Sequence, residues 1–416
     1  MREMKDSGIE WVGTIPAHWS TMPNKYVMRK IKVINPTYNG ENILSLTVNG
    51  VIVRDLEAGG KMPSSFDGYQ ILYKGNLLMC LFDYDVTPRC IGLIKDSGVS
   101  SPAYSQFVLQ RGNDAAYFYY YYLMVDHTKA LLHRAKNLRH SFTEEQLGAI
   151  KVPVPPIAEQ ERIADFLDSQ CSQIDAISAD IQKEIETLEQ YKRSLVFEAI
   201  SKGINGEKTA NASSDIWKEI PQSWKLVDIK YLFEIVKRIA GREGYNILSV
   251  TQKGLKVKDI SGNQGQIAEN YSGYQFVFPS DYVMNHMDLL TGWIDCSDQF
   301  GVTSPDYRVF RLRDKTQNDT EYYKYVMQCC YMCRIFYSLG QGVSILGRWR
   351  LQTSAFMNFK VPVPPLREQK GIARYLNDKC KEIELSIEQK RKQLELLSAY
   401  KKSLIYEYVT GKKEVI

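Results

Sequence analysis

The chain of 416 residues lacks a long apolar run and carries almost no excess of either charge. Its longest apolar-looking run, at 117–125, is far shorter than the ~18–20 residues that a membrane-spanning helix needs. The first residues include charges but no apolar stretch, so no secretory signal is visible and we expect a cytoplasmic protein. With 53 Lys and Arg against 48 Asp and Glu, the net charge of +5 neither requires nor excludes nucleic acid.

Signs of an active site are also missing. The five histidines form no recognisable nucleophile–base motif with a serine or cysteine, and no carboxylate cluster of a metallonuclease can be isolated. We therefore predict no catalytic and no metal-binding residues. Eight cysteines in so long a chain indicate buried thiols rather than a disulfide framework. Cys329, Cys330 and Cys333 follow helical spacing, but no second Cys or His pair accompanies them to complete the ~4 ligands of a zinc site.

The sequence contains an internal repeat, so that its two halves follow the same pattern. KVPVPP occurs at 151–156 and again at 360–365, an offset of 209 (360 − 151 = 209). Of the 17 residues that begin at each of these points, 11 are identical between the two copies. Upstream, IP-x-x-W occurs at 15–19 and at 220–224, an offset of 205 (220 − 15 = 205). Between such anchors the halves differ freely, as expected when one scaffold recognises two different targets.

Each half divides into a globule and a helix. Short β-rich runs alternate with turn signals, and helical segments at 117–132 and 321–337 interrupt them, so we expect a mixed α/β fold. After each KVPVPP the composition changes to Glu, Gln, Lys, Ile and Leu, which favours a long helix. The expected division is an N-terminal segment at 1–19, a first globule at 20–150, a central helix at 151–210, a second globule at 211–359 and a C-terminal helix at 360–416.

Both helices carry a seven-residue stripe of apolar side chains, which is typical of a coiled coil. The expected seam consists of Leu167, Ile174, Ile181, Leu188, Leu195, Leu376, Ile383, Leu397 and Leu404. Ile177, Ile185 and Tyr191 are expected in the alternate seam of the first helix. In the second helix, Lys390 interrupts the stripe at the position that corresponds to Ile181. Two such stripes in one chain most simply bury each other, so we expect an antiparallel pair of helices roughly 65 Å long.

An antiparallel pair of tandem repeats would acquire a pseudo-two-fold axis, with the globules at opposite ends of the rod. Double-stranded DNA has local two-fold axes as well, and a matching target is a site of two differing parts in opposed orientation. Those parts would be spaced by about one helical turn, roughly 34–36 Å, or by more if the DNA bends. Cys171 and Cys380 are equivalent in the repeat and would lie too far apart for a disulfide, so we expect small core residues.

Over essentially its whole length the chain resembles the specificity subunits of type I restriction–modification systems. The resemblance rests on the two PxPP-x-x-EQ-x-x-IA-x-x-L boxes, on the heptad helices that follow them, and on the tryptophan elements near the start of each half. In that family each globule is a target recognition domain that reads one half of a bipartite, asymmetric DNA site. The helices set the gap between the half-sites and dock two methyltransferase (modification) subunits.

The resemblance implies that this chain supplies sequence choice and assembly and is not itself an enzyme. The partners that it implies are double-stranded DNA, two modification subunits and two restriction subunits. The modification subunits use S-adenosylmethionine to methylate adenine, and the restriction subunits depend on ATP and Mg. No cofactor is expected on this chain.

The segments before the two PxPP boxes occupy the same place in the repeat but differ in sequence, so we expect them at the DNA. The expected DNA-binding residues are Lys136, Asn137, Arg139, His140, Gln341, Ser344, Arg348 and Arg350. Arg139 and Arg348 are expected near bases, because Arg can bind guanine through two hydrogen bonds. Asn137 and Gln341 are expected near bases because Asn and Gln bind adenine in the same way. Lys136 and Arg350 are expected on phosphates. The alternative is that these are solvated polar residues beside a loop.

Three further patterns have two interpretations each. Asn35-Pro36-Thr37-Tyr38 resembles the element with which amino-methyltransferases hold a flipped adenine, but no Gly-rich cofactor turn lies nearby, and an Asn-Pro turn is favoured. The GQGVS segment at 340–344 suggests a phosphate loop but lacks the Walker spacing, which favours a DNA-facing loop. The Tyr-rich stretch at 117–122 could stack on bases, but packing inside its globule is favoured.

The leading hypothesis is therefore a non-catalytic DNA-specificity subunit of a type I complex. One alternative is a coiled-coil adaptor whose globules bind proteins. Others are the specificity subunit of a related methyltransferase–nuclease outside type I, and a self-contained DNA methyltransferase, which the missing cofactor turn disfavours.

Overall fold

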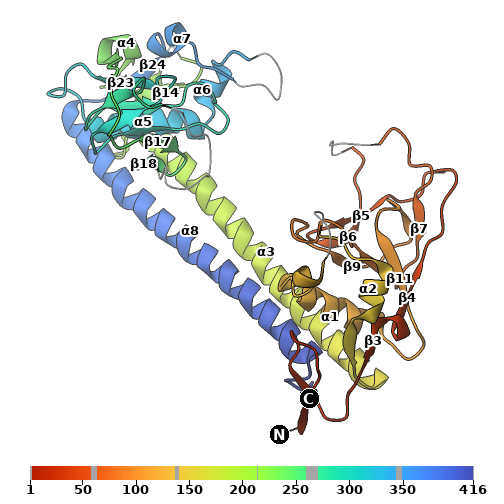
Figure 1. Ribbon diagram of the computed structural model, residues 1–416. Coiled ribbons are helices and arrows are strands. Elements are labelled where there is room, and N and C mark those ends of the chain that lie inside the picture. Colours follow the sequence, from red (N-terminus) through yellow and green to blue (C-terminus); the bar gives the residue numbers. More distant parts are fainter. Residues whose placement is uncertain are drawn as a thin grey trace. The chain divides into compact units, whose positions relative to one another are not determined.

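A computed structural model describes residues 2–57, 63–135, 140–212, 214–258, 270–342 and 349–415 of the chain (Figure 1). The chain divides into two compact units. Unit 1 comprises residues 1–181 with 392–416, and unit 2 comprises residues 182–391. Each unit thus contains one globule and one part of each long helix. The division expected from the sequence instead makes each helix a segment of its own, and it stays a prediction.

Unit 1 is built on a four-stranded antiparallel sheet in the order β4-β11-β8-β9. The strands are β4 (Met28–Ile31), β8 (Leu77–Met79), β9 (Ile91–Leu93) and β11 (Ser105–Leu109). Antiparallel pairs join β1 (Met4–Asp6) to β2 (Thr14–Pro16), β3 (Ser20–Pro23) to β12 (Lys151–Val154), β5 (Leu44–Thr47) to β6 (Gly50–Val53), and β7 (Gln70–Leu72) to β10 (Gly98–Ser100). The helices are η1 (Asn24–Tyr26), α1 (Ala115–His127), η2 (Leu132–Arg134) and α2 (Glu144–Ala149), and α1 packs against β9.

Unit 2 repeats this plan with the sheet order β16-β23-β20-β21. The strands are β16 (Phe233–Val236), β20 (Tyr282–Met284), β21 (Ile294–Cys296) and β23 (Arg308–Leu312). The pairs are β13 (Thr209–Asn211) with β14 (Glu219–Pro221), β15 (Lys225–Asp228) with β24 (Lys360–Val363), β17 (Leu248–Thr251) with β18 (Gly254–Val257), and β19 (Gln275–Val277) with β22 (Gly301–Thr303). The shorter helices are α4 (Ile229–Leu232), α5 (Thr320–Met332), α6 (Ile335–Ser338) and α7 (Thr353–Met357). The predicted mixed α/β fold with two repeated globules is confirmed.

The repeated box ties each long helix to its globule. In the first copy, Gln160 donates from Nε2 to the Pro155 carbonyl at 2.8 Å and accepts at Oε1 from the Asp114 backbone N–H at 2.8 Å. Asp114 is the N-cap of α1. In the second copy, Gln369 makes the equivalent pair of bonds at 2.8 and 2.7 Å. Because Gln supplies both a donor and an acceptor, it fixes the start of the long helix against the start of the globule's helix.

The Tyr-rich helix α1 lies in the core of unit 1. Its buried aromatic residues are Tyr117, Phe118, Tyr120, Tyr121 and Tyr122. The hydroxyl of Tyr117 donates to the Val409 carbonyl at 2.9 Å, and that of Tyr120 donates to Asp168 at 2.6 Å. Packing inside the globule, the interpretation favoured from the sequence, is therefore correct.

Both globular helices end earlier than the sequence predicts. The predicted segments ran to 132 and 337, but α1 ends at His127 and α5 at Met332. Shortly after each end stands a basic residue in the left-handed region, Lys129 at φ 49° and Arg334 at φ 54°. A residue in the left-handed conformation cannot continue an α-helix. The chain therefore changes direction at both places and continues into further short helical segments.

The long helices are α3 (Ile157–Lys202) and α8 (Leu366–Val409). Within unit 2 they run antiparallel, because Glu184 pairs with Lys390 and Lys192 pairs with Glu384. Within unit 1, Asp175 pairs with Lys401. The predicted antiparallel pairing is thus found inside unit 2, while the pseudo-two-fold relation and the placement of the globules at opposite ends stay predictions.

The predicted seam is buried or half-buried throughout. Its buried members are Leu167, Ile174, Leu376, Ile383 and Leu404, and its half-buried members are Ile181, Leu188, Leu195 and Leu397. The alternate seam predicted for the first helix was partly wrong. Ile185 is buried, but Ile177 and Tyr191 are 49% and 54% exposed.

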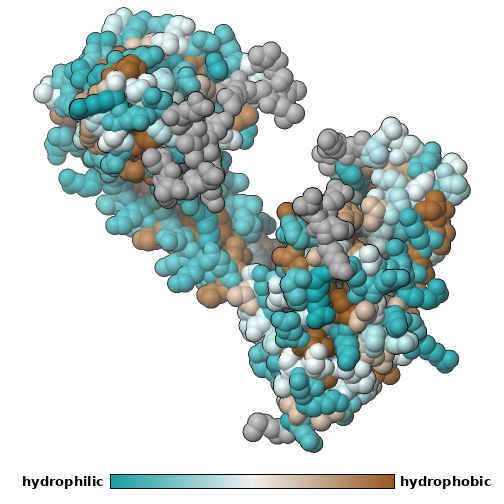
Figure 2. Space-filling model, in the orientation of Figure 1, coloured by the Kyte–Doolittle hydropathy of each residue, from teal (hydrophilic) through white to brown (hydrophobic). Residues whose placement is uncertain are grey.

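The physical reason lies in the heptad geometry. The second buried position of each heptad follows the first by four residues, which brings Cys171 and Cys380 into the seam at 4% exposure each. The interpretation of both cysteines as small core residues is confirmed. Figure 2 shows hydrophobic residues interrupting the otherwise hydrophilic surface of the long helices.

Candidate functional site

In each unit the same two loops meet at one junction. In unit 1, Phe142 donates its backbone N–H to the Leu81 carbonyl at 2.8 Å, and Tyr84 donates to the His140 carbonyl at 3.4 Å. The β8–β9 loop (80–90) is thereby joined to the segment before the PxPP box (133–142). This is the segment that the sequence places at the DNA.

Unit 2 makes the corresponding junction. Leu351 donates its backbone N–H to the His286 carbonyl at 2.9 Å, and Leu289 donates to the Trp349 carbonyl at 3.2 Å. These four residues are the repeat equivalents of the four in unit 1. The β20–β21 loop (285–293) therefore lies beside the segment at 340–351.

The loops that leave these junctions differ between the units. The offset in residue number between the two halves is 205 at the N-caps Asp114 and Asp319 (319 − 114) and 209 at the two boxes. The second pre-box segment is therefore four residues longer than the first. The β8–β9 loop spans 80–90, whereas its counterpart spans only 285–293, which is two residues fewer. Equivalent junctions in the two units thus present loops of different length and sequence.

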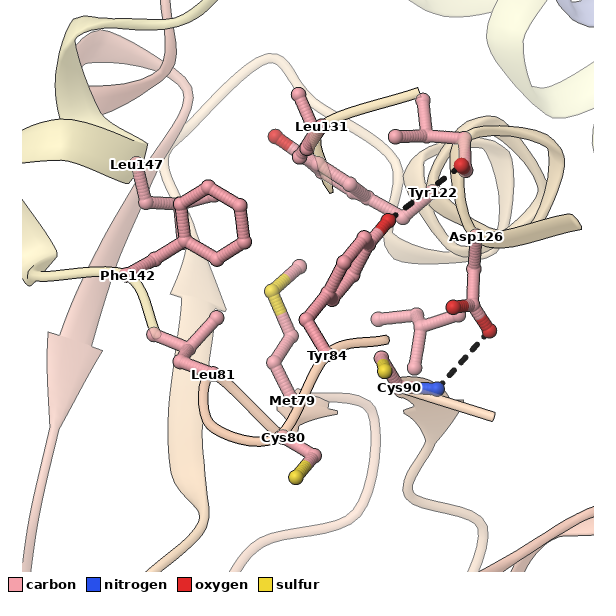
Figure 3. A pocket seen from close by; sticks show the side chains of 12 residues that line it. Met79, Cys80, Leu81, Tyr84, Cys90, Tyr122, Asp126, Leu131, Phe142 and Leu147 are labelled. Atoms are coloured by element: carbon pink, nitrogen blue, oxygen red, sulfur yellow. Dashed lines mark hydrogen bonds between the residues drawn. The ribbon is translucent and has the colours of Figure 1, made fainter. Parts of the chain in front are cut away.

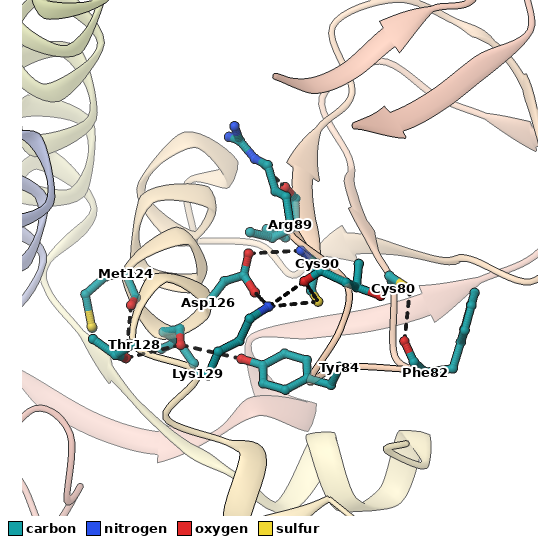
Figure 4. A network of polar contacts seen from close by, with 12 residues as sticks. Cys80, Phe82, Tyr84, Arg89, Cys90, Met124, Asp126, Thr128 and Lys129 are labelled. Atoms are coloured by element: carbon teal, nitrogen blue, oxygen red, sulfur yellow. Dashed lines mark hydrogen bonds and ion pairs between the residues drawn. The ribbon is translucent and has the colours of Figure 1, made fainter. Parts of the chain in front are cut away.

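A buried polar network holds the junction of unit 1 (Figure 4). The Asp126 carboxylate, 4% exposed, accepts the Cys90 backbone N–H at 2.9 Å and the Lys129 ammonium at 2.7 Å. Lys129 also donates to the Thr87 carbonyl at 2.8 Å, and its Nζ lies 4.7 Å from the centre of the Tyr84 ring. Lys129 thereby neutralises a buried carboxylate while it holds the β8–β9 loop.

Beneath the same loop lies a small, mainly apolar cavity. It is lined by side chains from β8, from α1, from the stretch between α1 and η2, and from the junction itself, among them Met79, Leu131 and Phe142 (Figure 3). Burial raises the pKa of the Tyr84 hydroxyl and of the Cys90 thiol, so both stay protonated at neutral pH. The cavity therefore offers a packed support for the loop rather than a nucleophile.

A different buried cation holds the junction of unit 2. Arg308, 5% exposed, donates to the Leu351 carbonyl at 3.0 Å and to Thr353 Oγ1 at 3.2 Å, and its guanidinium lies 4.9 Å from the Phe356 ring centre. Burial lowers the pKa of Arg308 to about 10, which leaves it charged at neutral pH. Gln341 and Arg350 exchange two backbone hydrogen bonds at 2.9 and 3.0 Å at the base of the segment between them.

The structure places three of the eight predicted DNA-binding residues. Lys136, Asn137, Arg139, Ser344 and Arg348 lie outside the described residues. His140 stands at φ 41°, with its ring Nδ1 3.1 Å from the Asp85 carboxylate. Gln341 and Arg350 are brought together as bonded partners. Contact of any of the eight with DNA stays a prediction.

Sequence reasoning missed the β8–β9 and β20–β21 loops as candidate site segments. A signal for them exists in the repeat, because the offset falls from 205 at β8 and β20 to 203 at β9 and β21. A change of loop length between two equally anchored strands marks a place where the halves have diverged.

The structure shows the surroundings of the competing chemical patterns. Asn35 accepts the Gly68 backbone N–H at its carbonyl at 2.9 Å and donates from its amide to Glu41 at 3.0 Å, and the Asn-Pro turn stays a prediction. Cys329 and Cys330 are buried, as predicted, whereas Cys333 is half-buried at the C-cap of α5. Of GQGVS, only residues 340–342 are described.

Two kinds of feature are absent from the described ranges. No group of three or more His, Cys, Asp or Glu within them is arranged to hold a metal ion. No helix in these ranges is both long enough and apolar enough to cross a membrane.

The chain thus contains two copies of one scaffold, and each copy presents its own pair of divergent loops. The sequence matches the family described as "Type I restriction modification DNA specificity domain" at residues 65–187 and 221–396, one match in each half and together more than half of the chain. The chain belongs to this family.

Two relatives from Methanocaldococcus jannaschii are similar to the chain. The type I restriction enzyme MjaVIII specificity subunit is 27% identical over 285 residues, which are 64% of this chain and 63% of that protein. The putative type I restriction enzyme MjaX specificity subunit is 27% identical over 305 residues, which are 69% of this chain and 64% of that protein. The matched region thus spans a little under two thirds of either relative.

A solved structure extends the similarity over nearly the whole chain. A chain from a study of complex assembly and conformational transition in a type I R-M system covers 96% of this chain and 99% of its own length. The TM-score is 0.67 at 13% sequence identity, which shows a shared fold.

Proposed function

We propose that the chain is the DNA-specificity subunit of a type I restriction–modification complex and that each unit reads one half of a bipartite site. The observation that supports this proposal is the junction that both units share. In each unit the junction presents two loops, and these loops differ between the units. Because the loops differ, the two half-sites should differ in sequence. The similar proteins named as specificity subunits support the same function.

Under this proposal the chain selects the DNA sequence and assembles the complex, and its partners carry out the catalysis. Two modification subunits would dock on it, bind S-adenosylmethionine and methylate adenine. Restriction subunits would add cleavage that depends on ATP and Mg. With a net charge of +5, the chain alone should hold DNA weakly, since non-specific affinity comes mostly from neutralised phosphates.

Co-expression with a cognate modification subunit tests the proposal. Methylated adenines in the host genome are mapped by single-molecule sequencing with and without this chain. The expected result is one bipartite motif with a fixed gap that appears only when the chain is present. If no methylation depends on the chain, the proposal fails and a protein-binding adaptor becomes the better explanation.

An exchange of globules then tests the assignment of half-sites. Residues 20–150 are replaced by the matching segment of another specificity subunit. The expected result is a motif in which one half changes and the other half and the gap stay. A change in both halves would contradict independent reading by the two units.

A further inference from the structure

The β8–β9 loop of unit 1 carries an unusually exposed apolar side chain. Val86 is 73% exposed, the largest value among the exposed large hydrophobic residues of the described chain. A single exposed Val needs no explanation on a flexible surface. This Val, however, sits on a tight turn, because Asp83 stands at φ 48° and its carbonyl accepts the backbone N–H groups of Val86 at 3.2 Å and Thr87 at 2.9 Å.

The turn is also fixed from below (Figure 4). Lys129 holds the Thr87 carbonyl, and Asp126 holds the Cys90 backbone N–H, so the two held residues, Thr87 and Cys90, lie within four positions of Val86. Burying a carboxylate costs free energy unless it is paired, and the buried Asp126 carboxylate accepts hydrogen bonds from both Lys129 and Cys90. A loop ordered in this way loses little conformational entropy when its tip meets a partner.

The position of the turn points to DNA. It is joined to the pre-box segment through the bond from Tyr84 to the His140 carbonyl. The turn carries an exposed carboxylate at Asp85, which lies 3.1 Å from the ring of His140. Carboxylates repel phosphates but can accept hydrogen bonds from the cytosine amino group, so the loop suits base edges better than the backbone. In the major groove, the apolar feature that a base edge offers is the thymine 5-methyl group.

We propose that residues 84–88 are a second base-contacting segment of unit 1, in which Val86 packs on the 5-methyl group of a thymine. Asp126 and Lys129 are positioning residues that hold this segment. The inference rests on the proposed function and adds to it a named residue and a named chemical group on the DNA.

The experiment uses the complete complex of this chain with its modification subunits. Methylation rates are measured on duplexes that carry the bipartite motif, with each thymine in turn replaced by deoxyuridine, which lacks the 5-methyl group. For the wild type, one replacement within the half-site of unit 1 should lower the rate about fourfold, the effect expected for one buried methyl group. Val86→Ala should show a similar loss on the natural duplex and no further loss at that position.

The matched control is Val33→Ala, a 41% exposed Val of the same unit outside this loop. It should keep the full sensitivity to deoxyuridine. If the wild type is indifferent to every replacement, or if Val86→Ala keeps the sensitivity, the inference is overturned while bipartite methylation still stands. If no bipartite methylation occurs at all, the proposed function has failed instead.

A second variant tests the positioning residues. The measured quantity is the base choice in each half-site, which a loss of stability alone would not change. Lys129→Met should relax base choice in the half-site of unit 1 and leave the other half-site unchanged, and Lys129→Arg should partly restore that choice. Equal losses at both half-sites would contradict a positioning role.

Discussion

The indole of Trp19 donates its Nε1 hydrogen to the Glu159 carboxylate at 3.0 Å, and Trp224 makes the same bond to Glu368 at 2.7 Å. Each Trp comes from the IP-x-x-W element and each Glu from the box that follows PxPP. The two most recognisable sequence elements of each half are therefore joined in space. Their repetition reflects a structural junction between the start of the globule and the start of the long helix.

Removal of this bond should destabilise the protein. In Glu368→Ala the N–H of Trp224, a residue only 5% exposed, loses its acceptor, so we expect a loss of about 1–3 kcal/mol in the free energy of unfolding. Urea denaturation measures the loss. Glu368→Gln is the control, because it keeps an oxygen acceptor and should lose clearly less. Equal losses in both variants would mean that packing rather than the hydrogen bond holds the junction.

Two half-buried histidines should make stability fall in mild acid. Burial lowers the pKa of His127 and of His286 to about 4, helped by Lys402 near the first and by Arg308 near the second. The unfolded chain takes up these protons from about pH 6.5 downward, whereas the folded chain does so only near pH 4. Stability is therefore lost as pH falls through this window. Because solvent screens these partly exposed rings, the loss should stay below about 1.4 kcal/mol per pH unit for each histidine.

The histidines can be tested one at a time. His127→Gln and His286→Gln should each flatten the dependence of the urea midpoint on pH between 6.5 and 4. The double variant should flatten it further. A pH profile that is unchanged in both single variants would show that other groups cause the acid sensitivity.

Much of this architecture could be predicted from the sequence because it is repeated. The exact match of KVPVPP revealed the two halves, and the heptads revealed the long helices. The seam was only partly predicted, because the second seam residue of a heptad can follow the first by three or by four residues. A spacing of three after Ile174 leads to Ile177, which is exposed. A spacing of four after Leu167 leads to Cys171, which is buried. That choice depends on the crossing of the two helices, which a single stripe does not specify.

The candidate site was harder to predict for a different reason. The pre-box segments are adjacent to a strong motif, so their place in the repeat could be read directly. The β8–β9 loop lies about 50 residues away in sequence and meets the pre-box segment through long-range contacts, such as the hydrogen bond from Phe142 to Leu81. The Asp126–Lys129 network has no sequence signature, because its geometry depends on the left-handed turn at Lys129.

The interrupted stripe of α8 offers a way to stabilise the protein. Lys390 occupies a seam position, and its ammonium pairs with Glu184, whose side chain is 57% exposed. An exposed ion pair contributes little, whereas burying an aliphatic side chain at this position should gain about 1 kcal/mol. Lys390→Ile should therefore raise the urea midpoint. Glu184→Gln removes the ion pair alone and should change stability by less than about 0.5 kcal/mol. A loss of stability in Lys390→Ile would show that the cation is required at this position.

The lengths of α3 and α8 should decide the gap in the DNA site. Both helices run through both units, so seven residues added to each at matched positions keep the heptad phase and the antiparallel pairing. Each insertion lengthens its helix by about 10 Å, which corresponds to roughly three base pairs of DNA. Mapping of methylated adenines should then show a longer gap between two unchanged half-sites. Insertion into α3 alone is the control, because it shifts the pairing against α8 and should abolish methylation. A double insertion that alters the half-sites and leaves the gap unchanged would contradict the helices as the element that sets the spacing.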